Sequence, residues 1–285
     1  KRRLMNNNDL GVYLVATPIG NLKDISKRAI ETIEGCDFII CENPKHSIKL
    51  LNNLGIKKKL ISLHDYNEAK VVEKISHNLA NKKIALISDA GSPLISDPGY
   101  KLIRFCISNN INVTSIPGPS SIIPALQLSG IPINSFSFYG FVPKTKKQMR
   151  DFVIELKKNN HTSIFFVSSH KLEICLEMLA DELADRLISV SKELTKINER
   201  VYRGLGLHIK KILLDKPENL KGEFIVVVDG KKTEDLEGLN IENYNSEIIK
   251  LLSKFSLTDV VEIVHKLTGI TKNKVYKWVL KQKKH

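Results

Sequence analysis

The chain has 285 residues, of which 42% are hydrophobic and 26% charged, and its formal net charge is +13 at pH 7. This length allows one large or two medium-sized domains. No run of 18 apolar residues occurs, so we expect no transmembrane helix and no membrane partner. The charge favours an anionic partner, nucleic acid before others, although a solvated lysine-rich surface would give the same excess.

The N-terminal residues 1–10 are charged and polar and lack an apolar segment, so we expect a disordered terminus without a secretory signal. The cysteines form no C-x-x-C pair, and most of them lie in apolar or helical runs. We therefore expect reduced, buried thiols in a cytoplasmic protein. These cysteines are Cys36, Cys41, Cys106 and Cys175.

Short apolar runs alternate with longer amphipathic segments, a pattern that predicts βαβ units and a mainly parallel sheet. In the first half, one helix is expected to begin after an N-cap at Asp24 or Ser26, and a separate helix is expected to end near Gly55. Another helix is expected to begin after an N-cap at Ser120. Two further helices are expected at 68–79 and 100–108. The strands are expected at 12–16, 38–41, 60–63, 84–87 and 111–116.

A second half begins near residue 131, and a charged linker near residue 230 leads to a basic, helical tail. In the tail, Thr258 is expected to cap one helix, Gly269 to end it and Thr271 to begin another. Such a pair resembles a helix-turn-helix, and a small packing bundle is the alternative. The expected domains are 11–130, 131–230 and 231–285. The second half should contain strands 135–139, 163–167, 187–190 and 223–228 and helices 146–156 and 172–183.

The most informative loop is 88–99, which reads Ser-Asp-Ala-Gly-Ser-Pro-Leu-Ile-Ser-Asp-Pro-Gly directly after an apolar strand. Prolines fix φ and glycines allow positive φ, so this loop should be rigid and tightly bent. Open α/β sheets bind small ligands in such loops, outside the carboxyl ends of their strands. The alternative is a surface turn with capping aspartates.

Several common site motifs are missing from the sequence: a phosphate-binding loop, a G-x-G-x-x-G turn, a zinc-spaced Cys/His pair and a nucleophile elbow. No metal site is therefore expected. Four strand-end loops, 17–21, 42–45, 88–99 and 117–121, should instead meet at one edge of a parallel sheet. They offer carboxylates, hydroxyls and carbonyls but few cations. A ligand with ribose hydroxyls and a cationic centre, such as S-adenosylmethionine, suits them better than a polyphosphate.

Several short strings occur in an order and spacing that resemble one known family. The chain resembles the bacterial 16S rRNA cytidine 2′-O-methyltransferases of the tetrapyrrole methylase superfamily, over essentially its whole length. The strings are Val-Ala-Thr-Pro-Ile-Gly-Asn-Leu-Lys-Asp-Ile from Val15, Cys41-Glu42, Asn67-Glu68, Ser-Asp-Ala-Gly from Ser88, Pro-Gly-Pro-Ser from Pro117, Phe-Tyr-Gly-Phe-Val-Pro from Phe138, Glu-Leu-Thr-Lys from Glu193 and Lys-Gly-Glu-Phe from Lys221.

The resemblance implies a homodimer of chains with two α/β/α domains, with S-adenosylmethionine bound in the cleft between the domains. It implies that a ribose 2′-oxygen of a decoding-centre cytidine, in 16S rRNA or the small ribosomal subunit, attacks the sulfonium methyl group in line, so that the thioether leaves as the O–CH3 bond forms. It places the cofactor against residues in three of the strand-end loops. These are Thr17, Pro18, Gly20, Asp89, Gly91, Ser92, Pro117, Gly118, Pro119 and Ser120.

A general base near the acceptor hydroxyl would add roughly 10²–10⁴-fold to the rate. The candidates are Glu42, Asp97 and Glu223, and each carboxylate has the alternative role of a helix cap or ion-pair partner. A second group of side chains is expected to hold rRNA phosphates, with a solvated surface as the alternative. This group consists of Lys45, Lys144, Lys146, Lys147 and Arg150.

The chain departs from the family pattern at several positions. Asn43-Pro44-Lys45 stands where the family has Asp-Thr-Arg, Val167 stands in place of a glutamate, and Lys171 and Lys192 replace arginines. Two negative charges are therefore lost, and lysine cannot reproduce a bidentate arginine contact. The lost charges at Asn43 and Val167 leave one alternative to an rRNA methyltransferase, a catalytically weakened, cofactor-binding ribosome-associated protein. The superfamily offers another, a methyltransferase of tetrapyrrole or corrin precursors, against which the basic tail and the Ala-Thr-Pro-Ile-Gly-Asn string argue.

Overall fold

The computed structural model describes residues 10–231, 244–268 and 270–282. The chain divides into two compact units, Lys1–Gly230 and Lys231–His285, and each is considered by itself. Apart from Leu10, the N-terminal segment expected to be disordered lies outside the described residues, as do most of the expected linker and Gly269.

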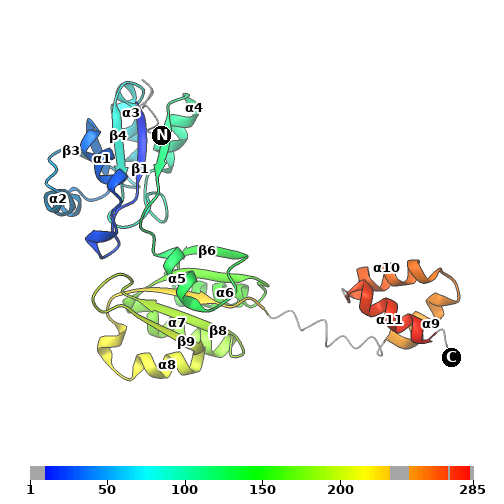
Figure 1. Cartoon of the computed structure of the whole chain (residues 1–285). Coiled ribbons are helices and arrows are strands. Elements are labelled where there is room, and N and C mark those ends of the chain that lie inside the picture. The colour runs from blue at the N-terminus through cyan, green and yellow to red at the C-terminus, as the bar shows by residue number, and fades with distance from the viewer. Residues whose placement is uncertain (1–9, 232–243, 269, 283–285) are drawn as a thin grey trace. The chain divides into compact units, whose positions relative to one another are not determined.

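The first sheet is fully parallel, with the strand order β3-β2-β4-β1-β5 (Figure 1). Each strand is short and largely apolar, as expected for strands that are covered on both faces. Because every strand runs in the same direction, all of their carboxyl ends lie at one edge. The strands are β1 (Gly11–Val15), β2 (Phe38–Cys41), β3 (Lys59–Ser62), β4 (Lys83–Ile87) and β5 (Val113–Ile116).

Helices cover both faces of this sheet. Helices α3 (Glu68–Leu79) and α4 (Tyr100–Ser108) pack on one face, where Val12, Ile40 and Leu86 are buried. On the other face, α1 (Lys27–Gly35) and α2 (Pro44–Asn53) cover Ile39 and Ala85. The strands and helices expected in this half are therefore present.

The second sheet has the order β6-β7-β10-β8-β9 and is mostly antiparallel. Only β6 and β7 run parallel, and the remaining neighbours pair antiparallel. The prediction of a mainly parallel sheet is therefore wrong for this half, because β10 lies between β7 and β8 and runs opposite to both, and because β8 pairs antiparallel with β9, a strand that the sequence pattern did not indicate. The strands are β6 (Phe136–Phe141), β7 (Thr162–Ser168), β8 (Leu187–Lys192), β9 (Arg200–Leu205) and β10 (Glu223–Val228).

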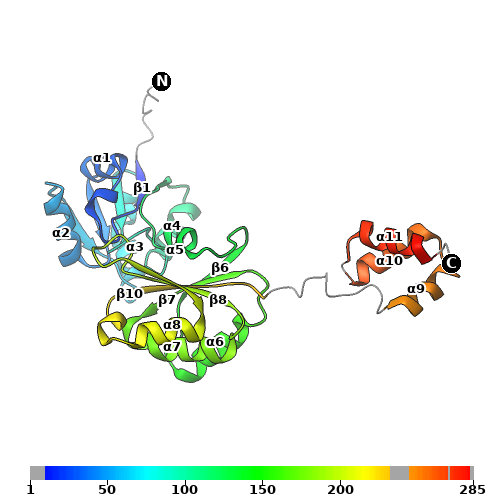
Figure 2. The same ribbon diagram turned by 60° about the horizontal axis from the view of Figure 1, so that its bottom comes forward.

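Helices also cover both faces of the second sheet, as Figures 1 and 2 show. On one face lie α6 (Lys146–Leu156), α7 (Ser169–Glu182) and α8 (Gly206–Leu214), which bury Phe165 and Val226. On the other face, α5 (Ile122–Ser129) packs against Ile164, Ile225 and Val227. A 3-10 turn over Pro217–Leu220 precedes β10, and another, over Leu22–Asp24, precedes α1. Strand β9, helix α8 and the first of these turns were not predicted.

The structure shows which residues cap the N-terminal ends of three helices. The Ser26 side chain accepts a hydrogen bond from the Ala29 N–H at 3.1 Å, so Ser26, and not Asp24, caps α1. Helix α5 begins after Ser121, and the prediction of Ser120 as its N-cap is wrong by one residue. At α2, the Asn43 side chain accepts from the Lys45 N–H at 3.1 Å and Pro44 occupies the first turn.

The described part of the second unit forms three helices, α9 (Asn245–Leu252), α10 (Leu257–Thr268) and α11 (Lys272–Gln282). They share a small core that includes Ile248, Val260 and Val275, which is the arrangement of a packing bundle. Ser256, whose hydroxyl accepts from the Asp259 N–H, caps α10, so the prediction of Thr258 is wrong. None of the helices in the described part of the chain has the length and apolar content needed to span a bilayer.

The start of α2 explains how two of the departures from the family pattern are accommodated. Asparagine is as good an N-cap as aspartate, and proline is favoured at the first helical position. The replacement of Asp-Thr by Asn43-Pro44 therefore preserves the helix start while it removes one charge.

We expect Asn43→Ala to lower the free energy of unfolding by about 1 kcal/mol, because the Lys45 N–H loses its acceptor. Asn43→Asp keeps an acceptor and should change the stability much less. Urea denaturation of the three proteins checks this, and equal losses for alanine and aspartate would contradict the capping role.

Candidate functional site

A cavity of about 360 Å³ lies at the carboxyl ends of the first sheet's strands. The first half of the chain lines it with the loops after β1, β4 and β5, and the second half with the ends of β6, β7 and β8 and the start of β10. This volume lies within the range of roughly 300–1,000 Å³ typical of small-molecule sites. Three of the four strand-end loops expected to meet therefore line this cavity, whereas Glu42 of the 42–45 loop lines a smaller pocket with Asp97, and residues of the second sheet complete the cavity.

Two strand-end loops are joined by a pair of backbone hydrogen bonds. The Thr17 N–H donates to the Gly91 carbonyl at 2.9 Å, and the Gly91 N–H donates to the Thr17 carbonyl at 2.9 Å. The buried Thr17 hydroxyl also donates to the Ser88 carbonyl at 3.2 Å. Thr17 thus holds the loop after β4 in place against the loop after β1.

The residues predicted to bind the cofactor divide into two groups. Gly91, Ser92 and Ser120 line the cavity directly. The others lie in the same loops but do not line it: Thr17, Pro18, Gly20, Asp89, Pro117, Gly118 and Pro119.

Asp89 is distinguished by an unsatisfied atom. Its Oδ1 is buried and has no hydrogen-bond partner in the structure. A buried polar atom without a partner costs free energy, so such an atom near a cavity is a natural contact for a polar ligand.

Three carboxylates from neighbouring strand-end loops form a cluster. Asp97 lines the cavity and, together with Glu42 and Ser88, a smaller second pocket. Burial, repulsion from Glu42 and repulsion from Asp89 raise the pKa of Asp97 to about 6, although the nearby Ser88 hydroxyl opposes this. Burial and the charges of Asp89 and Asp65 also raise the pKa of Glu42. Asp97 therefore changes its protonation state close to neutral pH.

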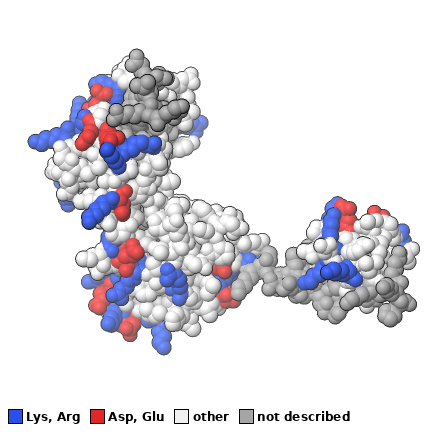
Figure 3. Space-filling model, viewed as in Figure 1, with Lys and Arg blue, Asp and Glu red and all other residues white. Residues whose placement is uncertain are grey.

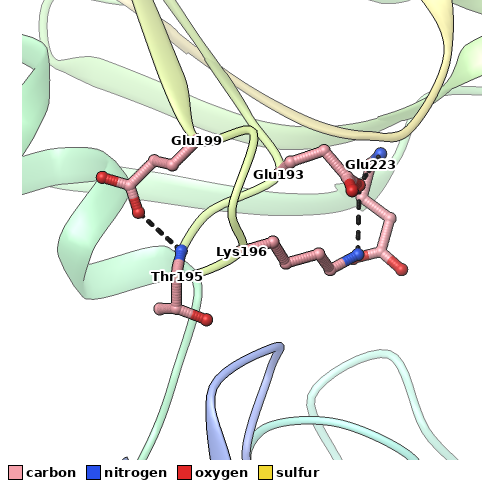
Figure 4. Close-up of polar contacts among 5 residues, drawn as sticks. All are labelled: Glu193, Thr195, Lys196, Glu199 and Glu223. Atoms are coloured by element: carbon pink, nitrogen blue, oxygen red, sulfur yellow. Dashed lines mark hydrogen bonds and ion pairs between the residues drawn. The ribbon is translucent and has the colours of Figure 1, made fainter.

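Glu223, the third predicted base, belongs to a different part of the cavity. It begins β10, its side chain is 77% exposed, and its carboxylate lies 3.0 Å from the Lys196 Nζ. Figure 4 shows Lys196 between the carboxylates of Glu193 and Glu223. The structure therefore brings Glu42 and Asp97 together but places Glu223 in an ion-pair network.

The turn formed by Glu193, Leu194, Thr195 and Lys196, called here the 193–196 turn, contacts the first half of the chain. Glu193 and Thr195 have φ values of 51° and 65°, a conformation that costs about 1–3 kcal/mol for residues other than glycine. A Cβ atom on Gly20 would lie 2.5 Å from the Lys196 Cγ. Gly20 is therefore needed for the close approach of the loop after β1 to this turn.

The residues predicted to contact rRNA are all exposed. Lys45 lies in the first turn of α2, whereas the other four follow β6 within one short segment, at Lys144, Lys146, Lys147 and Arg150. On the face of Lys1–Gly230 visible in Figure 3, basic and acidic side chains are interspersed.

Apart from Glu223 and the expected cleft between the domains, sequence reasoning assigned no role to the residues that the second half contributes to the cavity. This contribution includes Phe141, Phe166, Ser168, Leu194 and Ile225. The strings from Phe138, Glu193 and Lys221 marked these neighbourhoods, but their convergence depends on the antiparallel pairing that was not predicted. Within the described ranges, no group of three or more His, Cys, Asp or Glu side chains could hold a metal ion, and all four cysteines are free and buried.

The pH dependence of stability should reveal the ion-pair network. Burial alone would raise the pKa of Glu193, but hydrogen bonds from the Glu223 N–H and from Lys196 hold it below its ordinary value of 4.5. This carboxylate therefore contributes stability above pH 4.5, and the contribution is lost as the pH falls through its lowered pKa.

We expect Glu193→Gln to lower the free energy of unfolding by about 1 kcal/mol at pH 7 and by progressively less below pH 4.5. Chemical denaturation at a series of pH values measures this. Glu155→Gln, at an exposed position on α6, is the matched control and should have no pH-dependent effect. A loss that stayed constant down to pH 3 would contradict the ionic role of Glu193.

Comparisons with known proteins agree with this geometry. Residues 11–208 match the family model of the tetrapyrrole (corrin/porphyrin) methylases. The ribosomal RNA small subunit methyltransferase I of Haemophilus influenzae is 38% identical over 278 residues, which cover 94% of this chain and 96% of that protein. The protein of the same name from Halalkalibacterium halodurans is 41% identical over 220 residues, covering 77% and 75% of the two chains.

Among solved structures, the uroporphyrin-III-C-methyltransferase of Thermus thermophilus has a TM-score of 0.53 and 18% sequence identity, and the match covers 77% of this chain and 94% of that one. This likeness concerns the fold alone. The family model and the relatives, which match most of the chain, go further. The chain belongs to the tetrapyrrole methylase family, in the group that contains the ribosomal RNA small subunit methyltransferases I.

Proposed function

We propose that this chain transfers a methyl group from S-adenosylmethionine to the ribose 2′-hydroxyl of a decoding-centre cytidine in 16S rRNA. The methyltransferases of this family depend on S-adenosylmethionine. The names of the relatives support small-subunit rRNA as the substrate. The observation that carries the mechanism is the position of Asp97, whose carboxyl group lines the cavity and has a pKa of about 6.

The residues present fit this cofactor. The cavity combines apolar walls with hydroxyls and carboxylates, and the buried Asp89 Oδ1 lacks a partner that a ligand hydroxyl or amine would supply. We propose that Gly91, Ser92 and Ser120 contact the cofactor, and that Thr17 holds the loop that carries Gly91. When bound, S-adenosylmethionine supplies an electrophilic methyl group on a sulfonium centre.

Asp97 is the best candidate for the general base that takes the proton of the acceptor hydroxyl. A base is most effective when its pKa is near the working pH, and burial together with Glu42 places Asp97 in that range. Glu223 fits less well, because Lys196 already occupies its carboxylate. Glu42 acts through Asp97, whose affinity for a proton it increases.

The departures from the family pattern are compatible with an active enzyme. Asn43 retains the capping role of an aspartate. Val167 is 1% exposed and belongs to the hydrophobic core shared with α6 and α7, so an apolar side chain is well accommodated there. These observations favour catalysis over a weakened, binding-only protein.

Primer extension on 16S rRNA, at low nucleotide concentration, tests the function. A strain without this protein should lose the 2′-O-methyl stop at the decoding-centre cytidine, and the wild-type chain should restore it. Persistence of the stop in the deletion strain would overturn the proposal. Cofactor binding without methylation of purified small subunits or free 16S rRNA would support the binding-only alternative.

For Asp97→Asn we expect kcat to fall by roughly 10²–10⁴-fold, because the base is lost, with little change in the affinity for S-adenosylmethionine. The wild-type rate should rise with pH through about 6 and then level off, because only the ionised carboxylate accepts a proton. The residual activity of Asp97→Asn should not show this rise with pH.

Glu42→Gln provides a further check. Removal of its negative charge should lower the pKa of Asp97 and so move the rise in rate to lower pH. Asp215→Asn, at an exposed position after α8, is the control and should change neither rate nor profile. An Asp97→Asn variant with the wild-type profile would exclude Asp97 as the base.

Asp89→Ala should weaken binding of S-adenosylmethionine by about 10-fold or more, because a partner of the ligand is removed. Asp24→Ala, in the short turn before α1, serves as the control. Isothermal titration calorimetry measures both affinities, and an unchanged dissociation constant for Asp89→Ala would show that the aspartate has only a structural role.

We also propose that the chain acts in the cytoplasm as a homodimer, and that Lys45, Lys144, Lys146, Lys147 and Arg150 hold rRNA phosphates. Their exposure supports the second part, since a phosphate can reach each of them. The mass in solution, measured by light scattering, tests the dimer. Single lysine-to-alanine variants should weaken binding to small subunits and reduce its dependence on salt.

A further inference from the structure

Phe141 is an exposed aromatic residue in the wall of the cavity. It ends β6, and 62% of the residue is accessible although it is among the lining residues. Asp97, the proposed base, lines the same cavity. No role described so far requires a large apolar ring at this place.

A bulge in β6 determines the position of this ring. Phe138 pairs with Ile164 and Phe141 with Phe166, so β6 contains one more residue than β7 over this stretch. Such bulges redirect side chains and are common beside functional sites. Gly140 adopts a φ of 68°, which other residues rarely adopt, and it lies beside Ser96 of the loop that carries Asp97.

Other aromatic rings support Phe141 from one side. Its centroid lies 5.1 Å from that of Phe166, with the planes at 51°, and Phe166 meets Phe138 edge-on at 5.1 Å. Phe166 itself is only half-buried and lines the cavity. The three rings therefore form a supported platform with exposed aromatic surface at the cavity.

The segment that follows Phe141 is strongly basic. Residues 144–150 contain four cationic side chains and no acidic one, and the cationic side chains are exposed. The Lys171 ammonium donates to the Pro143 carbonyl at 3.2 Å and so holds the start of this segment. The ring of Phe141, the proposed general base Asp97 and a group of cations therefore belong to one region of the site.

We propose that Phe141 stacks on the base of the acceptor nucleotide, which leaves its neighbours in the RNA and inserts at the mouth of the cavity. This inference rests on the proposed function and extends it to substrate recognition. A nucleotide has three chemical parts, and the site offers a matching group for each: Phe141 for the planar base, Asp97 for the ribose hydroxyl and the 144–150 segment for phosphates. Aromatic side chains commonly stack on bases that have left the helix.

The exposure of Phe141 favours the RNA base over the adenine of the cofactor as its partner. The basic segment that begins three residues later contacts phosphates, which the cofactor lacks. The RNA is therefore the ligand that reaches both groups at once.

The test compares Phe141→Ala, Phe141→Trp and the wild-type chain in methylation of purified small ribosomal subunits. We expect Phe141→Ala to raise KM for the subunit by about 10- to 100-fold, with a smaller effect on kcat. Phe141→Trp should restore KM to within about threefold of the wild type. The dissociation constant for S-adenosylmethionine, measured by calorimetry, should change less than twofold in both variants, which also shows that they fold.

Phe136→Ala is the matched control, because Phe136 lies on the same strand, is 42% exposed and does not line the cavity. An unchanged KM for Phe141→Ala, or no rescue by tryptophan, would overturn the inference and leave the proposed function intact. A loss of cofactor affinity as large as the rise in KM would assign the ring to the cofactor instead. If the wild-type chain methylated no rRNA, the proposed function and this inference would both fall.

Discussion

The paired backbone hydrogen bonds between Thr17 and Gly91 are the constraint on which the site depends. They join the loops after β1 and β4, and the Thr17 hydroxyl adds a bond to the Ser88 carbonyl. The Ser88 hydroxyl in turn donates to the Gly91 carbonyl at 3.1 Å. A short set of bonds therefore fixes the start of the loop that carries Asp97, the carboxylate that we propose as the base. Because these bonds are local and largely buried, the geometry does not depend on a ligand to establish it.

The carboxylate cluster shows why a parallel sheet suits this chemistry. Glu42 follows β2, whereas Asp89 and Asp97 follow β4, which lies beside β2 in the sheet. Parallel neighbours bring these acidic loops to one edge, where their mutual repulsion and their burial keep a proton on Asp97 up to about pH 6. The fold thus tunes an ordinary aspartate by placing like charges close together.

The sequence predicted the first half of the molecule well and the second half only in part. Strand β2 and helices α3 and α4 occur at their predicted residues, because each has a clear apolar period and a capping or breaking residue at its ends. The second sheet was not predicted as antiparallel, since strand direction depends on connections that a local pattern does not contain. The missed lining residues have related causes: Leu194 follows β8, which pairs antiparallel with β10, and Phe141 follows a bulge in β6 that a local pattern does not reveal.

The lining of the cavity extends along the chain from Ile19 to Ile225, which has a consequence for how the protein matures. During synthesis the first sheet is complete once β5 has left the ribosome, yet most of the lining belongs to residues that are still to be made. A functional pocket can therefore form only when β10 has joined the second sheet as its central strand. With S-adenosylmethionine bound in this cavity, as we propose, the ligand would bind only the finished fold and would stabilise the mature chain by mass action.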